Sequence, residues 1–168
     1  MLGQEQVHKT YLDRARGFAA RWEQLAGEGD HYRLAFDQPG TWSQKYNLVW
    51  DRLLELNVFP PAVVEKELAF YKSRPNRYGL PLDNRADYTK IDWLAWTSSL
   101  AASRAGFAEL FDPAFRFANE SPTRVPLSDW YDTKNGKQSG FQARSVVGGI
   151  FIQMLSDKAL WQRYGHAE

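Results

Sequence analysis

Residues 76–97, NRYGLPLDNRADYTKIDWLAWT, run from a loop crowded with polar and aromatic side chains directly into an apolar helix. The loop contains glycine, proline and asparagine, which form turns, among charged residues and tyrosines. Thr89 lies three residues before Asp92, which is the spacing of a capping box, so a helix is predicted over residues 89–103. This helix has almost no polar side, which is typical of a helix packed on most of its circumference. The sequence therefore predicts a functional loop presented by a buried helix.

Apolar residues recur at intervals of three, four and seven along most of the remaining chain, which is typical of amphipathic helices. Thr41 and Gln44 have the spacing of a second capping box, so one helix is predicted to begin near Ser43. Pro61 is well placed at the first position of another. The predicted helices cover residues 5–26, 43–56, 61–73, 89–103, 105–118 (with either a break or a kink at Asp112 and Pro113) and 143–163.

Residues 130–141 have a different character, because Asn135 and Gly136 are the strongest sequence signal for a two-residue hairpin turn. The segments on either side of this turn, 130–134 and 137–141, are predicted to pair. The predicted fold class is therefore all-α, with one short β-hairpin near residues 130–141.

The formal net charge is +1, with 21 basic and 20 acidic residues scattered along the chain. This balance gives no electrostatic footprint for nucleic acid or an anionic membrane, so neither partner is expected. No apolar run approaches the roughly 18 residues that span a bilayer, and the N-terminus lacks the apolar core of a signal peptide. Cysteine is absent, which excludes disulfides, a thiol nucleophile and a thiolate metal site. Because the histidines do not cluster and no phosphate-binding glycine motif is present, no metal or other cofactor is expected.

Long connections alternate with short ones between the predicted helices. The long connections are residues 31–42, 76–88 and 123–142. This alternation places the long connections at one end of a helical layer, where we expect a cleft that contains Trp42, Asp83 and Asp129. An aromatic content of 15%, with seven tryptophans, exceeds what a core of this size needs. The surplus could line the cleft or could fill gaps between helices.

Carboxylates are the best catalytic candidates, because a pair of them could act as general acid and general base. Six aspartates lie in or beside the long connections: Asp37, Asp83, Asp87, Asp92, Asp129 and Asp132. Asp83 and Asp129 lead as catalytic residues, since each lies among aromatic side chains. Ordinary roles remain open for every one of them, including helix capping, hairpin formation and simple solvation.

Cations and aromatic side chains in the same connections are candidates for substrate binding. The candidates are Trp42, Lys45, Arg85, Trp130 and Tyr131. Lys45, Arg85 and also Arg144 could bind a substrate carboxylate, although cations beside so many aspartates are often structural partners. The three aromatic residues could stack on a sugar or form a wall of the cleft, although at least one is expected to be core.

Ser43 and Lys45 lie two residues apart at the predicted start of a helix. Side chains two apart on a helix point to different faces, and the pair does not reproduce the Ser-x-x-Lys spacing of other amidases. The sequence therefore does not favour a serine nucleophile here.

Three strings of the sequence carry a resemblance to a known family: TWSQKYNLVWDRLLELNVFP, YGLPLDNRADYTKIDWLAWT and VPLSDWYDTKNGKQSGFQARSVVGGIFIQML. They resemble the C-terminal part of the glutaminase A family of filamentous fungi and bacteria, over about residues 36–155. The resemblance implies hydrolysis of glutamine to glutamate and ammonia, a six-helical-hairpin catalytic domain, and a parent protein that is extracellular or periplasmic. It carries over no catalytic residue.

The family resemblance also implies an (α/α) toroid, in which inner and outer helices alternate. Six hairpins need twelve helices, and residues 1–168 offer six, so the chain is expected to form a single helical domain that is about half of the barrel. We therefore expect the isolated chain to have little or no glutaminase activity. We also expect it to cover the incomplete flank of the toroid by self-association.

Two other functions remain open on the sequence alone. The chain could belong to a glycoside hydrolase that uses paired carboxylates in a helical toroid, with a glycan rather than a small molecule as substrate. It could also be a helical interaction module without enzymatic activity. Release of ammonia from glutamine, compared with release of sugar from glycans, separates the two enzymes.

Overall fold

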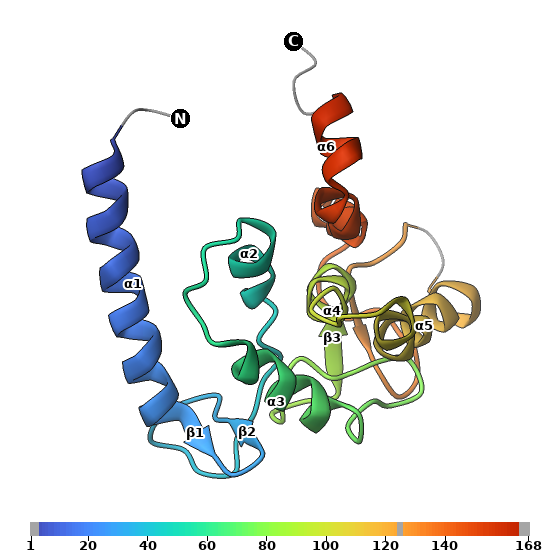
Figure 1. Cartoon of the computed structure of the whole chain (residues 1–168). Helices are drawn as coiled ribbons and strands as arrows, with labels where there is room; N and C mark the ends of the chain where they lie inside the picture. Colours follow the sequence, from blue (N-terminus) through green and yellow to red (C-terminus); the bar gives the residue numbers. More distant parts are fainter. Residues whose placement is uncertain (1–3, 124–125, 165–168) are drawn as a thin grey trace.

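The computed structural model describes residues 4–123 and 126–164, and over these residues the chain is mainly helical (Figure 1). The helices are α1 (Glu5–Ala26), α2 (Leu48–Leu53), α3 (Pro61–Tyr71), α4 (Ile91–Ser98), α5 (Arg104–Glu120), the 3-10 helix η1 (Ser145–Ser156) and α6 (Lys158–Tyr164). The strands are β1 (Gly27–Glu28), β2 (His31–Tyr32), β3 (Tyr88–Lys90) and β4 (Trp130–Asp132). They form two small antiparallel sheets, β1 with β2 and β3 with β4. The predicted all-α class is confirmed.

Three helices follow the sequence pattern closely. α1 has the predicted bounds, and α3 begins with Pro61 at its first helical position. α5 continues through Pro113 without a break, and its N-terminus is capped by Ser103, whose hydroxyl accepts a hydrogen bond from the Gly106 amide at 3.1 Å. In these helices the local spacing and the tertiary structure agree.

The predicted start of the second helix near Ser43 is wrong, since α2 begins at Leu48. The Thr41 hydroxyl donates to the Gln38 carbonyl at 2.6 Å rather than capping a helix. Gln44 is buried, and its side-chain amide donates to the Leu80 carbonyl at 2.9 Å. Buried backbone carbonyls require donors, so satisfying the loop outweighs the local capping signal.

The fourth helix begins at Ile91 and not at Thr89. Thr89 lies in β3, opposite Tyr131 of β4, and its hydroxyl accepts a hydrogen bond from the Gln44 side chain at 3.1 Å. Pairing of β3 with β4 holds the residues before Ile91 in an extended conformation. The capping box predicted at Thr89 and Asp92 is therefore also wrong.

The predicted turn at Asn135 and Gly136 is present. Gly136 has a φ of +69°, and its amide donates to the Asp132 carbonyl at 2.9 Å. The segment after the turn pairs with β4 through one isolated bridge, between Tyr131 and Gln138. The longer partner of β4 is β3, so the predicted pairing of 130–134 with 137–141 is only partly correct.

The predicted final helix is divided at Asp157 into η1 and α6. The Asp157 carboxylate accepts hydrogen bonds from the Ala159 and Leu160 amides, both at 3.0 Å, so it caps α6. Within η1, Gly149 lies so close to α4 that an added Cβ atom would be 2.7 Å from the Asp92 Cβ. A larger residue there would force the two helices apart.

Two hydrophobic clusters form the core, and α4 contributes to both. Ile91 and Leu94 pack in the first cluster with Phe117 and Tyr131, whereas Ala95 packs in the second. The prediction that α4 is buried on most of its circumference is therefore confirmed. In the part of the chain that the structure describes, no helix has the length and apolarity needed to cross a membrane.

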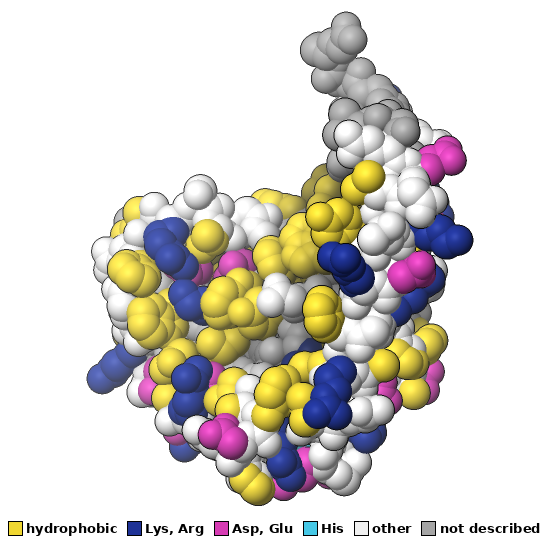
Figure 2. Space-filling view, turned by 90° about the vertical axis from the view of Figure 1, so that its left-hand side faces the viewer, with side chains coloured by type: hydrophobic (Ala, Val, Ile, Leu, Met, Phe, Trp, Pro, Cys, Tyr) yellow, Lys and Arg dark blue, Asp and Glu magenta, His cyan; other side chains and the backbone are white. Residues whose placement is uncertain are grey.

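Apolar side chains also lie on the surface. Figure 2 shows hydrophobic side chains around a hollow on the face that is at the left of Figure 1, where α1 forms one edge of the molecule. α1 is attached there by Arg16, whose Nε donates to the Asn57 carbonyl at 3.1 Å, and by Trp22, whose ring meets Phe59 edge-on at 5.5 Å. The rest of its apolar residues are largely exposed.

Candidate functional site

The three long connections contact one another through backbone hydrogen bonds. The Asn84 backbone amide donates to the Trp42 carbonyl at 3.3 Å, and the Trp42 amide donates to the Asn84 side-chain oxygen at 2.9 Å, so the first connection is joined to the second. The Tyr78 amide donates to the Thr133 carbonyl at 2.8 Å, and β3 pairs with β4, so the second connection is joined to the third. The elements predicted to carry function are therefore held together.

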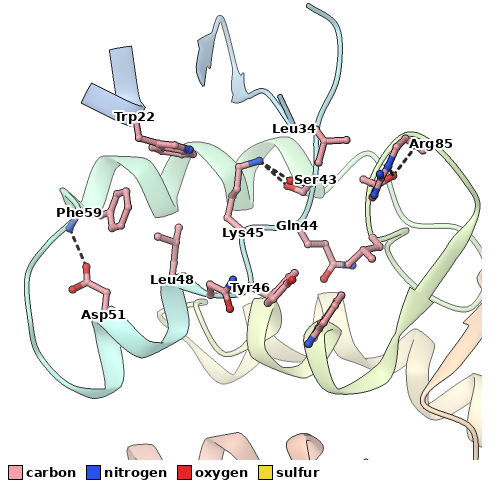
Figure 3. A pocket seen from close by; sticks show the side chains of 14 residues that line it. Trp22, Leu34, Ser43, Gln44, Lys45, Tyr46, Leu48, Asp51, Phe59 and Arg85 are labelled. Atoms are coloured by element: carbon pink, nitrogen blue, oxygen red, sulfur yellow. Dashed lines mark hydrogen bonds and ion pairs between the residues drawn. The ribbon is translucent and has the colours of Figure 1, made fainter. Parts of the chain in front are cut away.

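A cleft of about 520 Å³ opens where the first two connections meet α1, α2 and α4 (Figure 3). Apolar and polar side chains are interspersed in its lining. The apolar side chains include Trp22, Leu34, Leu48, Phe59 and Leu82, and the polar side chains include Ser43, Lys45, Asn47, Asp83 and Arg85. A concave site that combines an apolar lining with convergent polar groups is typical of small-molecule binding sites.

The polar residues come from an extended segment around Ser43 and from a tight turn at residues 83–86. Ser43 and Asp83 face each other across an antiparallel bridge. Because alternate residues of an extended chain point to the same side, Lys45 lies on the same side as Ser43. Arg85 lies in the turn closed by the bridge between Asp83 and Ala86, and its guanidinium folds back onto the Asp83 carboxylate. Gln44, between Ser43 and Lys45, points the other way into the core. The fold thus brings four polar side chains into the lining of the cleft.

Asp83 forms a two-point ion pair with Arg85. Arg85 Nη2 lies 2.7 Å from Asp83 Oδ2, and Arg85 Nε lies 3.0 Å from Oδ1. The Arg85 backbone amide also donates to Oδ1, at 2.9 Å. The Asp83 side chain is 3% exposed, whereas the Arg85 side chain is 63% exposed. This geometry suits Asp83 to orienting the guanidinium at the cleft, because its own oxygens are already engaged.

Lys45 also lines the cleft and is less exposed than Arg85. Its Nζ donates at 3.0 Å to each of three oxygens, the Tyr32 carbonyl, the Ser43 carbonyl and the Ser43 hydroxyl. Burial lowers the pKa of Lys45 below its usual range, and the nearby carboxylate of Glu67 opposes this shift. Lys45 is therefore a cation whose proton is held less tightly than that of an exposed lysine.

Glu67 of α3 lies behind Lys45 and is buried. Its Oε1 accepts a hydrogen bond from the Tyr32 amide at 2.7 Å, whereas Oε2 has no hydrogen-bond partner among the described residues. Burial raises the pKa of Glu67 above its ordinary 4.5, although Lys45 acts in the opposite direction. A carboxyl group beside the cleft is thus biased toward its protonated form.

Replacing Glu67 by glutamine is expected to change how stability depends on pH. With a raised pKa, the stabilising contribution of this carboxyl is present below pH 4.5 and is lost as the pH rises through the folded-state pKa. Glutamine keeps the acceptor for Tyr32 but cannot ionise, so the decline in unfolding free energy across that window is expected to flatten. Urea unfolding at a series of pH values measures it. The exposed Glu65 on the same helix is the control, and an unchanged slope in Glu67→Gln would contradict the assignment.

Asp129, the second predicted catalytic carboxylate, does not line this cleft. Arg144 binds it at two points, with Nη2 at 2.6 Å from Oδ2 and Nε at 3.2 Å from Oδ1, and Lys90 Nζ lies 3.6 Å from Oδ2. Burial raises the pKa of Asp129, but the Arg144 guanidinium outweighs it and the net pKa is lowered. The structure therefore does not bring Asp83 and Asp129 together in this cleft.

The predicted aromatic binding residues take different positions. Trp42 is buried against Phe70, and Tyr131 is fully buried with its hydroxyl donating to the Tyr78 carbonyl at 2.9 Å. Both belong to the core, as was expected of at least one of them. Trp130 is half-buried beneath Lys90, whose Nζ lies 4.8 Å from the ring centroid. None of these three residues lines the cleft.

Sequence reasoning missed the proximity of Ser43 to Lys45, because it placed both at the start of a helix. A signal was available in the string TWSQKY, where Ser43 and Lys45 alternate with Trp42, Gln44 and Tyr46, since residues two apart share one side of a strand. No group of three or more His, Cys, Asp or Glu side chains that could hold a metal ion occurs among the described residues.

The architecture is that of a mainly helical domain with a cleft formed by its connecting loops and helices. The family model described as "Glutaminase A six helical-hairpin domain" matches residues 1–154, so the chain belongs to this family. It is 35% identical over 149 residues to glutaminase A of Aspergillus oryzae. The aligned region covers 84% of the chain and 21% of that protein. It is 30% identical over 183 aligned positions to a probable glutaminase of Arthroderma benhamiae, which covers 91% of the chain and 20% of that protein.

The chain therefore spans about a fifth of the length of the curated relatives it matches. No solved structure matches the chain.

Proposed function

We propose that the chain forms part of an amidohydrolase that converts glutamine to glutamate and ammonia. The observation that carries the proposal is its similarity to glutaminase A of Aspergillus oryzae over 84% of the chain. The structure adds a cleft with several polar side chains, of a size suited to an amino acid, formed by segments within the matched region. A complete (α/α) toroid in the parent protein is part of the same proposal.

Arg85 is the residue best placed to bind the α-carboxylate of glutamine. Its guanidinium is held by Asp83 but is largely exposed at the cleft, so it retains N–H groups for a second carboxylate. Tyr46 and Trp93, whose rings stack at 4.3 Å, form the adjoining wall. Such a site recognises a small amino acid by charge at one end and by packing along its side chain.

The glycoside hydrolase alternative needs one protonated and one free carboxyl group facing each other across a substrate. Asp83 and Asp129 are instead each bound at two points by an arginine. Both oxygens of each carboxylate are thereby engaged by a guanidinium and are not free to meet a substrate. The ion pairs therefore weigh against this reading.

Binding of L-glutamine to the full chain tests the proposal. We expect chemical shifts of residues around the cleft to change with L-glutamine and not with neutral oligosaccharides. Arg85→Met is expected to weaken binding about 10- to 100-fold, since a hydrogen-bonded charge pair contributes about 1.5–3 kcal/mol. Ammonia release by the isolated chain is expected to be slow, because the relatives are about five times as long.

Arg77→Met is the matched control, because Arg77 is also exposed and ion-paired, with Glu120 at 2.8 Å, but does not line the cleft. A response to oligosaccharides alone would favour the glycoside hydrolase. The absence of any response would favour an interaction module without enzymatic activity.

A further inference from the structure

Ser43 and Lys45 form a close pair on the wall of the cleft. Ser43 Oγ lies 3.0 Å from Lys45 Nζ, and both residues line the cavity (Figure 3). The pair exists because residues 42–44 are extended and antiparallel to 82–84, with the Asn84 amide donating to the Trp42 carbonyl at 3.3 Å. In an extended segment, side chains two residues apart share one side, which the helical interpretation had excluded.

The three oxygens around Lys45 Nζ accept its three N–H groups when it is protonated, and they also accommodate a neutral amine. Two of its three partners, the Tyr32 and Ser43 carbonyls, can only accept hydrogen bonds. The third, the Ser43 hydroxyl, can donate. A neutral amine has two N–H groups, which can donate to the two carbonyls. It also has one lone pair, which can accept a hydrogen bond from the Ser43 hydroxyl. Burial of Lys45, which lowers its pKa, favours this form.

The backbone that carries the pair is also fixed. The buried Tyr71 hydroxyl of α3 donates to the Ser43 carbonyl at 2.9 Å and accepts a hydrogen bond from the Lys45 amide at 2.9 Å. A nucleophile and a base within hydrogen-bond reach, with the base oriented by further groups, is the arrangement that activates a serine.

We propose that Ser43 is the nucleophile and Lys45 the general base of an amide-hydrolysing site in this cleft. The substrate class, a primary amide such as the glutamine side chain, rests on the proposed function. The nucleophile itself does not.

The reaction balances with water as the second reactant. Neutral Lys45 takes the hydroxyl proton as Ser43 Oγ bonds to the amide carbonyl carbon. The resulting ammonium then gives that proton to the leaving nitrogen as the C–N bond breaks, so ammonia departs and an ester remains on Ser43. Lys45 next removes a proton from water, which attacks the ester carbon. The proton returns to Ser43 Oγ as the ester bond breaks, which releases the carboxylic acid.

Labelling with a fluorophosphonate tests the pair without requiring turnover of glutamine. We expect the intact full chain to gain one label, and peptide mapping to locate it on Ser43. Ser43→Ala is expected to abolish the label. Lys45→Arg keeps a long side chain with N–H donors but stays protonated and cannot supply a base, so it is expected to slow labelling of Ser43 by about 10²- to 10⁴-fold. Ser73→Ala is the control, because Ser73 is exposed and its hydroxyl donates to the Phe70 carbonyl rather than facing an amine.

Circular dichroism melting establishes that each variant is folded, and if Lys45→Arg is not, then mapping of the wild-type label and Ser43→Ala decide the question. No label on the folded wild-type chain, or a label elsewhere, overturns the proposal. So does labelling of Ser43 at the wild-type rate in folded Lys45→Arg. A labelled Ser43 in a chain that does not bind glutamine keeps the nucleophile and removes the proposed substrate. Binding of glutamine without a label on Ser43 keeps the proposed substrate and removes the nucleophile.

Discussion

Replacing Phe117 by alanine is expected to lower the free energy of unfolding by about 3–5 kcal/mol. Phe117 is fully buried, and its ring stacks on that of Tyr131 with centroids 3.6 Å apart and planes at 5°. Truncation therefore removes apolar burial and leaves a cavity beneath β4. Because small domains have only about 5–15 kcal/mol of stability, the variant is expected to be partly or wholly unfolded at moderate urea concentrations.

Phe115 provides the matched control, since it lies two residues earlier on α5 and its side chain is 69% exposed. Phe115→Ala is expected to change the unfolding free energy by less than about 0.5 kcal/mol. Urea titrations followed by tryptophan fluorescence compare the two. Equal losses would show that α5 packs with a different face than the one described, and that Tyr131 is not held in the core.

The isolated chain is expected to self-associate through α1, and Phe18→Glu is expected to make it monomeric. Val7, Tyr11, Phe18 and Leu25 are separated by four, seven and seven residues, which places them within about 40° of one another around the helix. All four are exposed, with Phe18 the most exposed at 75%. A stripe with this spacing is the surface that one helix offers to another, so a second copy of the chain is the expected partner.

The expected energy of this contact is large. If each copy covers about 400 Å² of apolar surface, the gain is about 10 kcal/mol per copy at about 25 cal/mol per Å² before the entropy of association is subtracted. Light scattering on the purified chain over a range of concentrations measures it. Gln24→Glu adds the same charge to an exposed position off the stripe and is expected to leave the dimer intact. A wild-type chain that stays monomeric at the highest concentrations would contradict the prediction.

The helices that could be predicted from sequence are those in which local signals and tertiary contacts agree. α1 and α3 follow apolar periodicity, and Pro61 marks where α3 begins. The two predicted capping boxes failed for one shared reason. Gln44 and Thr89 have the right spacing to cap helices, but they are buried together and hydrogen bond to each other at 3.1 Å. Gln44 and Thr89 lie 45 residues apart in sequence, so no local pattern could show that they are partners.

The site was predictable in part. Arg85, Asp83 and Lys45 were identified from their place in residue-rich loops, and all three line the cleft. Tyr131 was a binding candidate because of its neighbours in sequence, yet its side chain faces the core. Which side of a short strand is buried depends on the elements that cover it, and the sequence of the strand alone does not specify them.

Gln44 connects two of the segments that line the cleft to α4. Its Nε2 donates to the Leu80 and Pro81 carbonyls and to the Thr89 hydroxyl, while its Oε1 accepts a hydrogen bond from the Thr97 hydroxyl at 2.8 Å. One amide group therefore joins the segment that carries Ser43 to the loop before β3 and to α4. Neither of these segments can move away from α4 without leaving buried polar groups unsatisfied, so the cleft and α4 should open and close as one cooperative unit.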